Sequence, residues 1–167
     1  MSKCILSYSM TGNNDALAKR IAKATGAQHI AVTERKRSVL TIILDVVFGR
    51  VPKTQQDVSM LDGFDEVIFV GPVWMEKAAS PLRKYLLYIK ERNLPYKFVT
   101  ISGGSLHKNP KLKDDIVKYG GENLTLLKDM YISDLLGKDE VTMKETSGYK
   151  LTDDDLKAIA LPILEAL

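Results

Sequence analysis

The side chains best suited to hold a ligand lie together near the start of the chain. They are Ser9, Met10, Thr11, Gly12, Asn13 and Asn14. Hydroxyl and amide groups donate uncharged hydrogen bonds, and a glycine lets the backbone approach a ligand closely. A single residue of this kind would be enough to cap a helix, whereas this stretch has four besides the glycine. We therefore interpret it as a phosphate-binding loop rather than as a simple helix cap.

The loop stands where a strand should turn into a helix. Cys4-Ile5-Leu6 is an apolar run of strand length, and residues 15–22 carry apolar side chains at helical spacing. The start of a helix presents free backbone N–H groups and the positive end of the helix dipole. Both features favour an anion at this position.

Strands and helices alternate along the rest of the chain. Further strands are expected over residues 28–33, 66–70, 97–101 and 123–132. Helices should begin at Pro81, Pro110 and Thr152. Residues 67–70 are apolar throughout, as in a strand that is covered on both faces. The pattern predicts one α/β domain over residues 1–167, a doubly wound, three-layer sandwich with a parallel sheet between helices.

Two other distinctive loops follow the third and fourth of these strands. The first contains Pro72, Val73, Trp74 and Met75, and the second contains Ser102, Gly103, Gly104 and Ser105. Open parallel sheets bind ligands beyond the carboxyl ends of their strands, where the strand order reverses. We therefore expect both loops to meet the phosphate loop at one site.

Other phosphate and metal chemistries are excluded by particular residues. A thiolate phosphatase loop would need an arginine closing the loop after Cys4, and Met10 stands there instead. A P-loop needs Gly-Lys-Ser/Thr, and a dinucleotide fingerprint needs three spaced glycines, but the chain has Gly12-Asn13-Asn14. No metal site is expected, because we interpret the run Asp153–Asp155 as complementing a helix dipole and His29 as a surface residue of a strand.

In its three loops and in the order of its elements, the chain resembles the flavodoxin family. That family holds the phosphate of FMN in a Thr/Ser-x-Thr-Gly-x-Thr loop, and residues 9–14 are similar to it except that Asn14 replaces the last hydroxyl residue. The resemblance implies a short-chain flavodoxin-like protein with sheet order 2-1-3-4-5 and FMN as its cofactor. It also implies that residues 72–75 and 102–105 contact the flavin ring, with Trp74 packed on the ring rather than in the core.

Three functions are compatible with this resemblance. The leading hypothesis is an electron carrier between redox partner proteins, in which FMN performs the redox chemistry and no side chain is catalytic. The alternatives are an NAD(P)H- or quinone-dependent FMN oxidoreductase and a flavodoxin-like interaction module without a cofactor. No Tyr/His pair or basic pocket for a nicotinamide phosphate stands out, which favours the carrier. The net charge of +3 favours the enzyme, because carriers of this family are usually acidic.

The charge of the chain is unevenly distributed. Residues 1–60 have nine Lys/Arg against four Asp/Glu, and residues 121–167 have five against ten. We interpret this as a mixed solvated surface rather than as a basic docking face. Nucleic-acid binding is not expected, since the basic residues are not interleaved with aromatic ones. The chain has no signal-peptide pattern and no apolar run near the roughly 20 residues that span a bilayer, so we expect a cytoplasmic location.

The segment Val39–Phe48 is apolar nearly all round. It is flanked by Arg35, Lys36, Arg37, Arg50 and Lys53. We expect a helix that is buried in the core or covers the ligand. A homodimer interface through Val39–Phe48 is an alternative. A helix on a membrane surface is the least favoured interpretation, because such a helix should have one strongly polar face.

Overall fold

The apolar runs form a five-stranded sheet in the computed structural model, which describes residues 2–36, 38–104, 109–138 and 141–167. The strands are β1 (Lys3–Ser7), β2 (Gln28–Ala31), β3 (Glu66–Val70), β6 (Tyr96–Ser102) and β7 (Leu124–Tyr131). They are all parallel, in the order β2-β1-β3-β6-β7. Counted among these five strands alone, this is the order 2-1-3-4-5, so the predicted sheet is confirmed.

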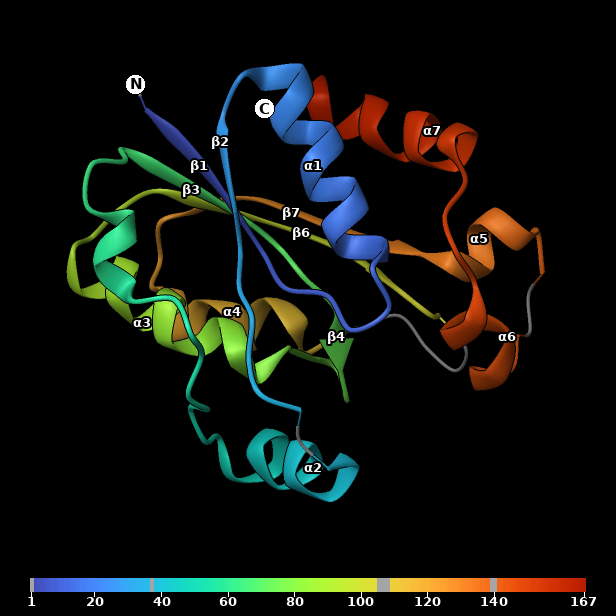
Figure 1. The fold of residues 1–167 in the computed structure, drawn as a ribbon, viewed down its shortest axis with the longest axis horizontal. Helices are drawn as coiled ribbons and strands as arrows, with labels where there is room; N and C mark the ends of the chain where they lie inside the picture. The colour runs from blue at the N-terminus through green and yellow to red at the C-terminus, as the bar shows by residue number, and fades with distance from the viewer. Residues whose placement is uncertain (1, 37, 105–108, 139–140) are drawn as a thin grey trace.

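Helices cover both faces of the sheet (Figure 1). On one face α1 (Asn13–Thr25) and α7 (Asp153–Leu164) pack over a core that includes Ile5, Ile68 and Val99. On the other face α3 (Arg83–Glu91) and α4 (Leu112–Gly120) pack over Leu6, Phe69 and Phe98. Successive residues of β1 and β3 thus point to opposite faces and are buried on both. The predicted three-layer α/β sandwich is confirmed.

The start of α7 explains the acidic run near the carboxyl terminus of the sequence. The Thr152 hydroxyl accepts a hydrogen bond from the Asp155 backbone N–H, and the Asp155 carboxylate accepts one from the Thr152 N–H. This reciprocal pair is a capping box, and the other two carboxylates lie in the first turn, where the helix dipole favours negative charge. Among the described residues, no group of three or more metal-ligating side chains comes together.

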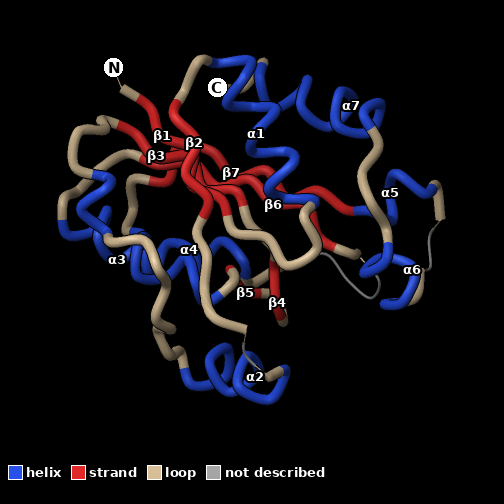
Figure 2. Tube along the Cα trace, in the orientation of Figure 1, coloured by secondary structure: helices blue, strands red, loops and turns tan. Residues whose placement is uncertain are grey.

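Two stretches expected to be irregular are ordered into small elements. Residues 73–78 form a hairpin of β4 (Val73–Trp74) and β5 (Lys77–Ala78), which Figure 2 shows beside the main sheet. Residues after β7 form α5 (Ile132–Leu136) and α6 (Met143–Gly148), two short helices that were not predicted from the sequence. The 3₁₀ turns η1 (Val58–Leu61) and η2 (Ser80–Leu82) precede β3 and α3.

Helix α2 (Val39–Phe48) has the predicted bounds but a different environment from the one expected. Only Asp45 and Val46 are buried in it, while Val39, Leu40 and Phe48 are exposed by 71, 67 and 66%. In Figure 1 the helix lies apart from the sandwich, beyond the hairpin. The expectation of a buried core helix was therefore wrong. The apolar composition of a helix does not by itself place any of its faces against the sheet. No helix within the described ranges is both long and apolar enough to cross a bilayer.

Candidate functional site

The loop from β1 to α1 leaves the first turn of the helix without a side-chain cap. Gly12 is the N-cap residue, with a φ of 93°, and no side chain caps the helix from this position. The Gly12 N–H donates to the Ser9 hydroxyl oxygen at 2.9 Å, which closes the loop on itself. A left-handed residue here is compatible with glycine but strained for other residues. The N-terminal N–H groups of α1 consequently have no side-chain cap from the N-cap residue, and in the loop before them Met10 is exposed and Thr11 half-buried.

The side chains of Asn13 and Asn14 form hydrogen bonds with backbone groups elsewhere in the chain, which the sequence did not predict. The Asn14 amide lies 3.0 Å from the Ile101 carbonyl oxygen, to which it donates, and its oxygen accepts from the Ile101 N–H at 3.1 Å. The Asn13 amide donates to the Tyr149 carbonyl at 2.8 Å, and its oxygen accepts from the Leu151 N–H at 3.1 Å. Both side chains are buried. These side chains fasten α1 to β6 and to residues 149–151, so the expectation that Asn13 and Asn14 contact a phosphate now concerns their backbone N–H groups and stays a prediction.

Lys150 brings a positive charge to the loop that sequence reasoning missed. Its ammonium group donates to the Thr11 carbonyl oxygen, although 139 residues separate the two in sequence. The Asn13 side chain holds the neighbouring backbone on both sides of Lys150, and Tyr149 is further held by a 2.9 Å bond from its hydroxyl to Asp155. The backbone of Lys150 is therefore held in place, although its side chain is exposed.

The second loop meets the first through two aromatic rings. Trp74 lies in the β4–β5 hairpin, and its ring packs edge-on against the Tyr8 ring with a centroid distance of 5.7 Å. Tyr8 is buried and its hydroxyl donates to the Glu34 carboxylate at 2.7 Å. Trp74 is half-buried, and Met75 at the tip of the hairpin is 61% exposed. The structure thus places the Trp74 indole ring beside the loop that precedes α1. Part of the ring surface remains accessible.

The third loop adjoins the same edge of the sheet, but its glycines have a packing role. A Cβ atom on Gly103 would lie 2.7 Å from the Thr146 hydroxyl oxygen, and one on Gly104 would collide with Ser133 and Tyr131. Gly104 also has a φ of 73°. These glycines are needed for close contact with β7, α5 and α6. Ser102 is half-buried, whereas Ser105 lies outside the described residues.

Beyond the third loop, the chain is anchored by a polar cluster at the end of β7. The Asn109 amide donates to both Asp129 carboxylate oxygens at 3.1 Å, and its N–H donates to the Tyr131 hydroxyl at 3.0 Å. Tyr131 in turn donates to Asp129. Burial is the largest cause, and this bond to a carboxylate the next, of a rise in the pKa of Tyr131 to about 12. Its hydroxyl is therefore protonated and a donor at neutral pH.

Ser7, Asp15 and His29 form a second polar cluster, at the base of the phosphate loop. The Ser7 hydroxyl donates to Asp15 at 3.0 Å and lies 2.8 Å from His29 Nε2, and the same nitrogen is 3.5 Å from Asp15. In a serine-hydrolase triad, opposite nitrogens of the imidazole face the serine and the carboxylate. Here one nitrogen faces both, and Ser7 is fully buried, so the cluster cannot activate a nucleophile.

The charges of this cluster are adjusted by their contacts. Burial alone would raise the pKa of Asp15, but hydrogen bonds from Lys19 and Ser7 and the charges of Lys19 and His29 outweigh it and lower that pKa. Burial lowers the pKa of His29. A carboxylate thus stands in the first turn of α1 but is turned toward Lys19, which lies 2.7 Å away. The Lys19 ammonium group thus faces this negative charge at the start of α1, next to the predicted phosphate loop.

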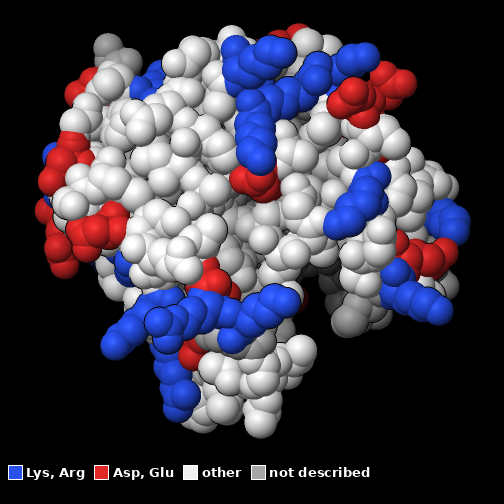
Figure 3. Space-filling view, viewed as in Figure 1, with Lys and Arg blue, Asp and Glu red and all other residues white. Residues whose placement is uncertain are grey.

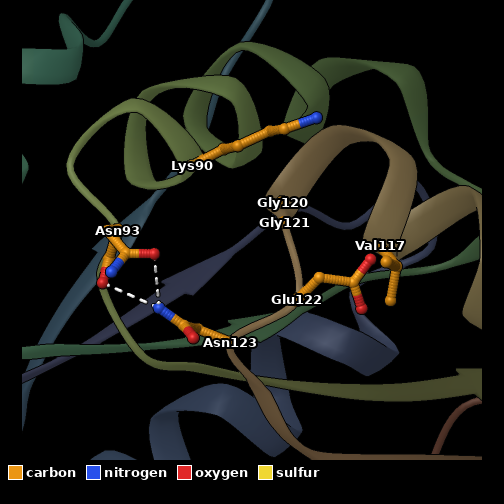
Figure 4. A pocket seen from close by; sticks show the side chains of 7 residues that line it. All are labelled: Lys90, Asn93, Val117, Gly120, Gly121, Glu122 and Asn123. Carbon is orange, nitrogen blue, oxygen red and sulfur yellow. Dashed lines mark hydrogen bonds between the residues drawn. The ribbon is translucent and has the colours of Figure 1, made fainter.

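A pocket of about 290 Å³ lies at the opposite edge of the sheet (Figure 4). Its lining includes Lys90 near the end of α3, and Asn93, Gly121 and Asn123 from the turns that precede β6 and β7. The Asn123 amide donates to the backbone and side-chain oxygens of Asn93, at 2.8 and 2.9 Å. Ligands of open parallel sheets bind at the carboxyl ends of the strands. We therefore assign the candidate site to the three loops at those ends, and not to this pocket at the amino ends of the strands.

Comparison with known proteins agrees with this architecture. No family model and no curated protein sequence matches the chain. A flavoprotein from Lactobacillus acidophilus NCFM, solved in complex with FMN, is 20% identical with a TM-score of 0.62, over 81% of this chain and 96% of its own. A short-chain flavodoxin associated with a bacterial microcompartment is 16% identical with a TM-score of 0.52, over 100% and 97%. The Streptococcus pneumoniae TIGR4 flavodoxin is 13% identical with a TM-score of 0.50, over 99% of both chains. The chain has the flavodoxin-like fold.

Proposed function

We propose that the protein binds FMN at the loop edge of its sheet and carries electrons between redox partner proteins. The observation that carries the proposal is the contact between Tyr8 and Trp74, because it places a partly exposed indole ring against the loop that leads into the uncapped start of α1. A ligand that combines a phosphate with a flat ring system fits this pair of features. The FMN-bound flavoprotein with the same fold supports the choice of ligand.

Each part of the site would contribute a separate function. The N–H groups at the start of α1 would bind the phosphate, with Thr11 and Lys150 at its side. Trp74 would pack on the ring and exclude water from it. The third loop would border the ring through its backbone at Ser102 and Gly103. When bound, FMN supplies the electron-transfer chemistry, and the protein adjusts its potential through nearby charges and hydrogen bonds.

Flavin binding can be measured directly by titrating the purified protein into FMN and following the quenching of flavin fluorescence. We expect saturable binding, and we expect Trp74→Ala to weaken it about tenfold because a stacked aromatic contact is lost. Leu161→Ala is the matched control, because Leu161 is an apolar residue 59% exposed on α7. Protein that neither contains nor takes up FMN would contradict the proposal and favour an interaction module.

A second measurement separates an electron carrier from an enzyme. The FMN-loaded protein is mixed rapidly with NADH or NADPH, and the loss of flavin absorbance is followed. A carrier should be reduced slowly by either nucleotide, and rapidly only by a partner protein. Fast direct reduction would instead identify an oxidoreductase on the same fold.

A further inference from the structure

Helix α2 displays an apolar face to solvent. Val39, Leu40, Ile43, Val47 and Phe48 are exposed by between 41 and 71%, and Val51 just after the helix is exposed by 44%. Residues 39, 43 and 47 follow one another at intervals of four, so they form a stripe along one side of the helix. Scattered exposed apolar residues are common, but a contiguous stripe of this kind marks a contact surface.

The helix is fixed to the molecule through its backbone, on the side away from this stripe. The buried Arg83 guanidinium donates from Nη1 to the Asp45 and Arg50 carbonyl oxygens, at 2.7 and 3.0 Å. Lys77 of the hairpin donates to the Val46 carbonyl oxygen at 3.3 Å. The attachment therefore holds α2 in place while its apolar side chains remain exposed. In Figure 1 the helix projects from the sandwich at its outer limit.

Positive charge surrounds both ends of the apolar face. Arg35 and Lys36 precede the helix, Arg50 and Lys53 follow it, and all four are exposed. Between residues 35 and 56 the sequence has one acidic residue, Asp45, which is buried. Figure 3 shows Lys and Arg side chains gathered beside the uncharged surface of this projection. The surface is thus apolar in the middle, basic at its ends and without an exposed carboxylate among the described residues of this segment.

We propose that α2 is a docking site for an anionic lipid membrane, on whose surface it lies without crossing. The aliphatic side chains and Phe48 would enter the boundary between headgroups and acyl chains, and the basic residues would remain at the level of the anionic headgroups. The sequence argued against this use, because the helix has no strongly polar face of its own. In the structure the side of α2 that contains Asp45 and Val46 is attached to the body of the protein, so this side does not need to be a polar face toward water.

A membrane fits this surface better than two other occupants. A second copy would bring the same four cations against it, with no exposed carboxylate on the segment to neutralise them. An acidic partner protein would satisfy the charges, but a typical protein interface also contains about ten direct hydrogen bonds. The stripe consists of Val, Leu, Ile and Phe, which only bury area. The proposal does not depend on FMN, because no residue of α2 belongs to the candidate flavin site.

The experiment is co-sedimentation of the purified 167-residue chain with lipid vesicles. One set contains phosphatidylglycerol and phosphatidylcholine in equal amounts, and the other contains phosphatidylcholine alone. We expect binding to the anionic vesicles and a progressive loss of binding as salt is raised. Leu40→Asp should weaken binding by about tenfold or more, because it places a carboxylate in the apolar stripe. Arg50→Gln with Lys53→Gln should weaken it about fivefold for each charge removed.

Matched controls lie on the opposite face of the sheet. Leu161→Asp changes an apolar residue of α7 that is 59% exposed, and Lys23→Gln removes an exposed cation of α1, so both should bind as the unchanged chain does. No binding to anionic vesicles, or equal binding to both vesicle types at all salt concentrations, would overturn the proposal. So would a dimer of the unchanged chain in analytical ultracentrifugation that Leu40→Asp dissociates, because that result would assign the surface to a second copy. The comparison of vesicle types remains decisive even if a variant fails to fold.

Discussion

The two asparagines at the start of α1 have side chains suited to bind a phosphate, but in the structure these side chains stabilise the fold. Asn13 and Asn14 have the donor chemistry of a phosphate loop, yet each forms a pair of bonds with backbone groups elsewhere. Asn14 reaches both the N–H and the carbonyl of Ile101 from inside the core. Its position therefore fixes the helix start relative to β6, and the ligand is left to the backbone N–H groups.

We expect Asn14→Ala to lower the free energy of unfolding by about 2 kcal/mol, because two buried backbone groups of Ile101 lose their partner. Urea denaturation measures this change. Thr11→Ala, in the exposed loop, should leave stability almost unchanged but reduce affinity for FMN more than for riboflavin, which lacks the phosphate. If Asn14→Ala kept full stability and lost only FMN affinity, the asparagine would be a ligand contact after all.

Lys150 should make the proposed phosphate site sensitive to charge. With its ammonium group at the Thr11 carbonyl, Lys150→Met should weaken FMN binding about fivefold through loss of a charge-assisted contact, and it should leave riboflavin binding unchanged. The salt dependence of FMN affinity should decrease in the same variant. Lys23→Met is the control, since Lys23 lies in the last turn of α1, at the other end from the loop. Equal losses for FMN and riboflavin would show that Lys150 acts on the fold of the loop instead.

At the scale of the element, the β4–β5 hairpin is held in an unusual backbone conformation. Its two turn residues, Met75 and Glu76, both have positive φ values, 50° and 62°. Two-residue hairpins commonly need this geometry, but they usually place Asn or Gly there. The strain lies directly beside Trp74, so the hairpin positions the aromatic ring at some loss of stability.

Glu76→Gly should therefore raise the free energy of unfolding by about 1 kcal/mol, because glycine adopts a positive φ without steric strain. Glu76 loses only an exposed ion pair with Lys111, at 3.3 Å, which contributes little. Asn93→Gly is the comparison: Asn93 also has a positive φ, of 53°, but asparagine tolerates it and its side-chain oxygen accepts a bond from Asn123, so that change should not stabilise the protein. Thermal and urea unfolding of both variants measure the difference. A gain for Asn93→Gly equal to that for Glu76→Gly would contradict the assignment of strain to the hairpin.

The elements also show which features can be read from a sequence. The five strands and the limits of α2 follow from local periodicity, which the sequence displays directly. The hairpin could not be predicted, because Met75-Glu76 lacks the Gly or Asn that normally signals such a turn. The roles of Asn14 and Lys150 depend on partners 87 and 139 residues away, and no local pattern reports contacts at that distance. The exposure of α2 is likewise a result of how the chain packs.

At the scale of the whole molecule, the net charge of +3 should influence any bound flavin. A reduced flavin gains negative charge, and positive surroundings favour the form that carries it. Lys150 stands at the phosphate loop, and Lys and Arg side chains gather over α1 and beside α2 (Figure 3). Carriers of the family that this chain resembles are usually acidic, so their net charge has the opposite sign. The potential for full reduction should therefore be less negative here than in those relatives.

The sign of the salt effect tests this expectation within the protein itself. Added salt screens the surrounding charges, and at about 0.1 M it limits their reach to about 10 Å. If positive charge stabilises the reduced flavin, the potential should become more negative as salt rises, and it should do so less in Lys150→Met. An acidic environment would produce the opposite slope. A spectroscopic redox titration of the FMN-loaded protein at low and high salt measures both the potential and its slope. A strongly negative potential that rises with salt would contradict the expectation, because local contacts at the ring would then outweigh the charge of the molecule.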